Sequence, residues 1–112
     1  NVYAAELIPI RNATSVVTEY VEALTAAGII VMAGTEHNTL DRIPLDPFCP
    51  DGPLPEAARA AFYEATCIVA AHQALVAEGK PGYVDATGAV VGDPAARRTE
   101  LAALGHSIIT GA

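Results

Sequence analysis

The chain has 112 residues, of which 52% are hydrophobic and 17% charged, and its formal net charge is −7. A chain of this length can bury about two thirds of its unfolded surface, which suits one compact domain, whereas a complete (β/α)8 barrel needs about 200 residues or more. The six basic residues are scattered along the chain, so nucleic acid is excluded as an expected partner. The sequence begins with Asn1 rather than Met and shows no leader, so we expect a fragment of a longer protein.

Hydropathy and cysteine content indicate the cellular compartment in which the protein is expected. The longest apolar stretch, residues 26–33, is far shorter than the ~20 residues that span a bilayer, so we expect no membrane partner. Cys49 and Cys67 do not form a CxxC pair, and the composition is not that of a disulfide-rich scaffold. We therefore expect reduced thiols in a cytoplasmic protein, with a disulfide between these two residues as the alternative.

The first 42 residues have the pattern of a βαβ unit. Residues 4–10 read as a short strand that ends near Pro9. Apolar residues then recur at helical spacing from Asn12, which we expect to cap the helix, to Gly28, which we expect to end it. Residues 29–33 form a continuous apolar run typical of a strand in a parallel sheet. The functional end of such a unit is the carboxyl end of its second strand.

The rest of the chain divides into a proline-rich loop and a helical part. Residues 43–55 contain five prolines, so we expect a loop or lid without a regular ladder, anchored by Leu45, Phe48 and Leu54. Residues 56–112 predict a long helix over 56–78, a hairpin over 82–91, a helix from the cap Asp93 to Leu104 with Gly105 as its stop, and a final strand over 106–110.

These elements predict an α/β fold: a βαβ unit plus long helix, β-hairpin and C-terminal helix, in one compact domain or fragment. We further expect the chain to be part of a (β/α)-barrel-like protein, because the fully apolar strand needs cover on both faces.

Residues 34–38, Gly-Thr-Glu-His-Asn, contain the strongest candidate site. Glu36 and His37 directly follow the buried strand and offer an oxygen and a nitrogen ligand that suit a divalent metal. Adjacent strand residues point to opposite faces, so both can reach one ion only where the backbone has turned, which Gly34 permits. The alternative is that these two side chains only bond to the neighbouring backbone.

The stretch 24–38 resembles the last block of the PHP-domain metal-dependent phosphoesterases, in which a Gly-Ser-Asp-x-His motif follows a strand. Gly34 matches the motif glycine, Thr35 the serine and Glu36 the acidic ligand. The chain departs from the motif because His37 occupies the variable position and Asn38 stands where the histidine ligand belongs.

The resemblance implies a distorted (β/α)7 barrel with a cluster of divalent metals of the Zn, Mn or Fe class. It also implies a phosphoester small molecule as substrate, hydrolysed by a metal-activated water. Glu36 and His37 would bind metal, and Thr35 and Asn38 would support them from the next layer. The remaining ligands would come from sequence before Asn1, so the isolated chain is expected to be inactive.

Other polar residues carry weaker signals. Cys67 and His72 are five residues apart on one helix, which rotates them by about 140° and disfavours a shared site. Glu64 shares a face with His72, where we expect a hydrogen-bonded structural histidine, and His106 is also expected to be structural. Acidic residues in the loop, Asp41 and Asp46, could approach Glu36 but are expected to be solvated.

Three functions remain open on sequence grounds. The first is the C-terminal segment of a PHP-like metal-dependent phosphoesterase. The second is a non-catalytic α/β interaction or oligomerisation domain, in which a second copy covers exposed apolar surface. The third is part of another barrel hydrolase or isomerase, in which Glu36 and His37 transfer protons.

Overall fold

The computed structural model of the chain describes residues 2–112. These residues form a mixed α/β structure with three α-helices, one 3-10 helix and two small sheets, which confirms the α/β class. The chain divides into two compact units, residues up to Phe62 and residues from Tyr63 onward, and each unit is described by itself.

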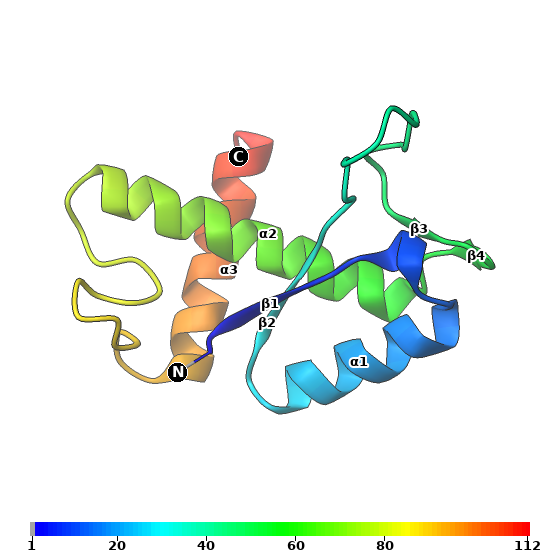
Figure 1. Cartoon of the computed structure of the whole chain (residues 1–112). Helices are drawn as coiled ribbons and strands as arrows, with labels where there is room; N and C mark the ends of the chain where they lie inside the picture. The colour runs from blue at the N-terminus through cyan, green and yellow to red at the C-terminus, as the bar shows by residue number, and fades with distance from the viewer. Residues whose placement is uncertain (1) are drawn as a thin grey trace. The chain divides into compact units, whose positions relative to one another are not determined.

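The first unit contains the expected βαβ arrangement. Strand β1 (Ala4–Leu7) is followed by a 3-10 helix, η1 (Pro9–Arg11), then by α1 (Thr14–Ala26) and by β2 (Ile30–Ala33). The two strands pair in parallel, from Ala4 opposite Ile30 to Leu7 opposite Ala33. Figure 1 shows them side by side, with α1 as the connection. Residues 8–10 do not continue β1 because Pro9 opens the 3-10 turn.

Helix α1 ends as expected but is capped differently. Gly28 follows its last turn with a φ of 79°, a left-handed conformation that glycine adopts without strain. Asn12 is not the cap, because the cap position is Ala13 and the Asn12 side chain donates to the Ile8 carbonyl at 2.9 Å. Asp51 does the capping instead, accepting the Thr14 backbone N–H at 2.9 Å and its hydroxyl at 3.0 Å.

The proline-rich segment forms a ladder, contrary to the expectation. Strands β3 (Phe48–Cys49) and β4 (Gly52–Pro53) pair antiparallel over two residues each. So short a ladder needs few N–H donors, which lets Pro53 take part. Of the three expected anchors only Leu54 is buried, whereas Leu45 is 81% exposed and Phe48 39% exposed.

One apolar core holds the first unit together. Its buried members come from α1, β2, β3, the residue Leu54 just before α2 (Glu56–Ala77), and the first turns of α2: Val17, Val21, Val31, Cys49, Leu54, Ala58 and Phe62. Burial of these side chains packs β2 against α1 and against the β3–β4 pair. This packing also determines where β2 ends.

The second unit contains the rest of α2 and helix α3 (Pro94–Thr110). Asp93 caps α3 as expected, accepting the Ala96 N–H at 2.9 Å. Gly105 does not end this helix, and the strand expected over 106–110 is helical. Gly105 is buried, and a Cβ there would overlap the Cys67 carbonyl, so the glycine marks a close approach of α2 and α3.

The hairpin expected over residues 82–91 is reduced to one antiparallel bridge, between Val84 and Val90. Asp85 organises its turn, since its carboxylate accepts the Thr87 hydroxyl at 2.6 Å and the Thr87 N–H at 2.8 Å. Gly88 supplies a φ of 82°.

Within the described part of the chain, one helix, α2, is long and apolar enough by length and composition to cross a membrane. Its mean hydropathy over 18 residues is 1.2, and 28% of that window is buried. The core helix of a soluble protein meets the same criterion, and two compact units are consistent with a soluble protein. The sequence expectation considered only residues 26–33 and overlooked this alanine-rich helix.

Candidate functional site at the end of β2

Residues 34–38, the strand-end segment, leave the sheet directly after Ala33. A Cβ on Gly34 would overlap the Glu6 carboxylate and the end of the Ile8 side chain. The position therefore favours glycine, because a larger residue would displace the ends of these two side chains. This contact gives a physical reason for the glycine of the motif that the sequence singled out.

Glu36 lies in the left-handed region, with a φ of 50°, which is uncommon for a residue other than glycine. Its carboxylate accepts from Arg11 Nε at 2.7 Å, and its carbonyl accepts the Asn38 N–H at 3.0 Å. Arg11 closes η1, just after β1, so the ion pair joins the carboxyl ends of two parallel strands. The two side chains are 58% and 38% exposed. A pair this exposed contributes little to stability.

Both ring nitrogens of His37 have partners within the loop. Nε2 lies 2.7 Å from the Ile43 carbonyl and Nδ1 lies 2.9 Å from the Thr35 hydroxyl. A carbonyl oxygen can only accept, so the neutral ring carries its proton on Nε2 and accepts from Thr35 at Nδ1. Thr35 thus contacts His37 directly, while Asn38 is exposed and contributes its backbone N–H to Glu36.

The donors of the strand-end segment fit a divalent metal in type but not in number. A carboxylate and an imidazole are ordinary ligands of zinc, manganese and iron. Among residues 2–112, however, no group of three or more His, Cys, Asp or Glu side chains is placed to hold an ion. In this conformation Glu36 is also paired with Arg11, and His37 with Thr35 and Ile43. A complete site would need further ligands and an exchange of these contacts.

An apolar crevice adjoins the segment. It is lined by Gly34 and Thr35 together with Ile10, Ile43 and Phe48. Two of its lining residues, Ile10 and Thr35, directly precede Arg11 and Glu36 in the chain.

The weaker candidates have other partners. Asp46 pairs with Arg59 at 3.4 Å, and Asp41 accepts from the Thr39 hydroxyl at 3.0 Å. Glu64 lies 3.5 Å from Arg98. His72 is hydrogen-bonded, as expected, because its Nδ1 accepts the Tyr83 backbone N–H at 3.0 Å.

His106 packs edge-to-face on Tyr63, and its Nδ1 lies 2.7 Å from the phenol oxygen. Burial, followed by a hydrogen bond with the Cys67 thiol, raises the pKa of Tyr63. This arrangement joins α2 to α3 and agrees with a structural role for His106.

Cys49 and Cys67 are free and buried. Burial, followed by the nearby charge of Asp51, raises the pKa of the Cys49 thiol. A buried thiol with a raised pKa is a poor nucleophile, so this cysteine acts as a small core residue.

Sequence reasoning missed Arg11, which lies 25 residues from its partner Glu36. A basic residue in the connection that follows the first strand of a parallel βαβ unit is the signal that could have found it, because both strand ends meet at one edge.

Comparison with protein-family models, with curated proteins and with solved structures gives no match.

Proposed function

We propose that this chain is the C-terminal segment of a PHP-like metal-dependent phosphoesterase, in which Glu36 and His37 supply part of a divalent-metal site. The observation that carries the proposal is the position of both side chains directly after β2, at the carboxyl end of a parallel βαβ unit. This edge is where parallel α/β folds place their ligands.

The size of the sheet supports membership of a larger fold, such as a (β/α) barrel. Within residues 2–112 the parallel sheet has only two strands, so the outer edge of each lacks a strand partner. Parallel sheets occur almost only as larger sheets with both faces covered. Additional strands at these edges would bring further loops, and hence further metal ligands, to the carboxyl end.

In the intact protein the metals would activate a water and stabilise charge on the phosphoryl oxygens of a small phosphoester. Glu36 would bind through its carboxylate and His37 through a ring nitrogen, and Thr35 would orient the ring through their hydrogen bond. Arg11 would balance the charge of Glu36 while no metal is bound. The buried free thiols support a reducing, cytoplasmic location.

Cobalt absorption titrations test the proposal, with Co²⁺ standing in for zinc. The chain should bind Co²⁺ weakly, and Glu36→Gln and His37→Gln should each weaken binding about tenfold or more. Glu19→Gln is the matched control, since Glu19 is an exposed carboxylate on α1.

Two results would contradict the proposal. One is the absence of Co²⁺ binding by the unaltered chain at millimolar metal, and the other is equal binding by all three variants. Activity that depends on Glu36 without any metal dependence would instead support the hydrolase or isomerase in which these residues transfer protons.

A specific observation favours a second function, a non-catalytic interaction or homo-oligomerisation domain. An open groove of about 410 Å³ runs between α1 and the start of α2, lined by Val21, Ala26, Ala57 and Ala61 among others. Sedimentation equilibrium would detect a dimer that Ala57→Glu disrupts and that Ala60→Glu, on the exposed surface of the same helix, leaves intact. A monomer at high concentration would exclude self-association.

A further inference from the structure

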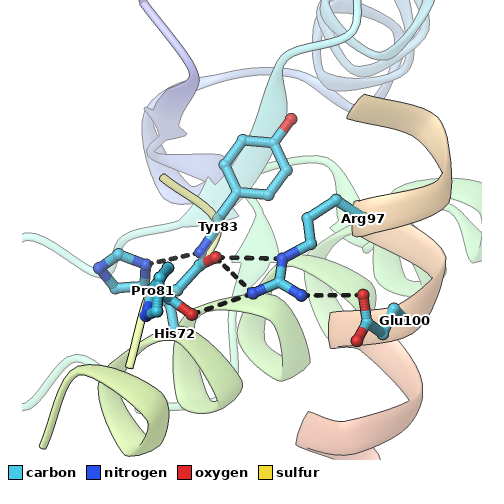
Figure 2. A network of polar contacts seen from close by, with 6 residues as sticks. His72, Pro81, Tyr83, Arg97 and Glu100 are labelled. Carbon is cyan, nitrogen blue, oxygen red and sulfur yellow. Dashed lines mark hydrogen bonds and ion pairs between the residues drawn. The ribbon is translucent and has the colours of Figure 1, made fainter. Parts of the chain in front are cut away.

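The segment that follows α2, residues 79–83, is held by two side chains from the helices of the second unit. Figure 2 shows Arg97 of α3 pointing toward the Pro81 and Gly82 carbonyl oxygens. It also shows His72 of α2 facing the backbone nitrogen of Tyr83. None of these residues belongs to the strand-end segment, so the role of His72 and Arg97 is independent of the proposed phosphoesterase.

Arg97 donates hydrogen bonds to two backbone carbonyls of this segment. Its Nη2 donates to the Pro81 oxygen at 3.0 Å and to the Gly82 oxygen at 2.7 Å, and its Nε also donates to Gly82 at 3.1 Å. Its Nη1 pairs with Glu100 at 2.8 Å, and the Arg97 side chain is 13% exposed. A guanidinium is charged at every pH at which the protein is folded, so this contact does not change with pH.

The contact of His72 depends on its protonation. The Tyr83 backbone N–H donates to Nδ1 at 3.0 Å, so Nδ1 must be unprotonated and the neutral ring carries its proton on Nε2. Gly82 lies directly against the same nitrogen, because a Cβ at Gly82 would overlap Nδ1. A proton on Nδ1 would therefore meet a backbone N–H in a closely packed site.

We propose that His72 is a pH-sensitive latch for the Tyr83 amide. When the imidazole is neutral, it accepts the Tyr83 N–H and holds the segment against α2. When the imidazole is protonated, both ring nitrogens are donors, the hydrogen bond is lost, and the Tyr83 amide turns away from the ring. Arg97 keeps its hydrogen bonds to the Pro81 and Gly82 carbonyls, so the change is confined to the Tyr83 amide and does not unfold the unit.

The movement would reshape a pocket of about 430 Å³ beside the ring. Its lining includes His72, Val76, Lys80, Pro81, Val84 and Asp85. The charged residues near the ring are Lys80 and Asp85, which line the pocket, and Arg97 of α3, which bonds to the adjacent Gly82 carbonyl. Glu78 and Glu100 neutralise Lys80 and Arg97 in turn, at 2.6 Å and 2.8 Å. These two pairs leave the Asp85 carboxylate, which accepts from Thr87, as the remaining charge of the group, and the hydrogen bond at Nδ1 determines the response.

Amide hydrogen exchange of the full chain, read by NMR, tests the latch. From about pH 7.5 to about pH 5, the protection of the Tyr83 amide, corrected for the intrinsic exchange rate, should fall about tenfold or more. The Arg97 amide, which donates to the Asp93 carbonyl at 2.9 Å in the first turn of α3, is the internal control and should not change.

His72→Gln keeps an acceptor but cannot be protonated in this range, so Tyr83 protection in this variant should not depend on pH. The tautomer of His72 in the unaltered chain, read from ring nitrogen shifts, gives a test that needs no variant: the proton should lie on Nε2 at neutral pH. A proton on Nδ1, constant Tyr83 protection, or the same pH dependence in His72→Gln would each overturn the proposal.

Discussion

The two units use their charged side chains in different ways. In the first unit, Arg11 and Glu36 form an exposed pair at the end of a strand, and neither side chain holds the core together. In the second, Arg97 is nearly covered and donates to the carbonyls of two consecutive loop residues. This difference indicates that the Arg11–Glu36 pair can exchange partners at little cost in stability, whereas the contacts of Arg97 maintain the fold.

The largest effect is expected at the close approach of α2 and α3. Gly105→Ala introduces a Cβ that overlaps the Cys67 carbonyl, so it should lower the free energy of unfolding by about 3 kcal/mol in urea denaturation. Ser107→Ala, at an exposed position of the same helix, is the control and should be nearly neutral. Equal stability of the two variants would show that the helices do not meet at Gly105.

The next effect tests the difference between the units with the same substitution in each. Arg97→Met removes charged hydrogen bonds from the Pro81 and Gly82 carbonyls and should cost about 2 kcal/mol. Arg11→Met removes only the exposed pair with Glu36 and should cost about 0.5 kcal/mol or less. If urea denaturation gave equal losses, the distinction between the units would be wrong.

The smallest effect is a pH dependence at the start of α1. Hydrogen bonds from the Thr14 backbone and then its hydroxyl lower the pKa of Asp51 below its usual 3.8. The ionised carboxylate is therefore the form that stabilises the helix. Its contribution is fully present above the unfolded value and is lost as the pH falls through the lower folded pKa.

NMR of the Thr14 amide measures this change. Its shift should follow a titration below pH 3.8, and Asp51→Asn should abolish that titration. The Thr87 amide is the counterpart in the second unit, because hydrogen bonds from the Thr87 hydroxyl and then its N–H lower the pKa of Asp85. The Thr87 amide shift should follow the same titration in Asp51→Asn as in the unaltered chain. If the Thr14 amide shift titrated in the same way in Asp51→Asn, Asp51 would not be the cap of α1.

Local patterns in the sequence predicted the elements that depend on near neighbours. The helical spacing before Gly28, the apolar run of β2 and the cap Asp93 are each decided within a few residues, and all three are confirmed. Predictions failed where a residue that is distant in the sequence determines the local structure. Gly105 lies inside α3 as the residue that fits against Cys67 and not as a helix stop, and Asn12 does not cap α1 because Asp51 does.

The candidate site was predictable in position but not in its contacts. The order of strand, glycine and acidic residue placed Glu36 and His37 at the end of β2, where the structure has them. The pairing with Arg11 and the contact of His37 with Ile43 depend on how two loops meet, and no local pattern encodes this.

The most direct test of the central claim, that the strand-end segment binds a divalent metal, is NMR of the His37 ring during addition of Zn²⁺. Without metal at neutral pH, the proton should lie on Nε2, as the contact with the Ile43 carbonyl requires. Added Zn²⁺ should shift the His37 ring nitrogens, and Glu36→Gln should reduce the response, while His72 and His106 stay unchanged. A His37 ring that keeps its Nε2 proton and its shifts at millimolar Zn²⁺ would contradict the account.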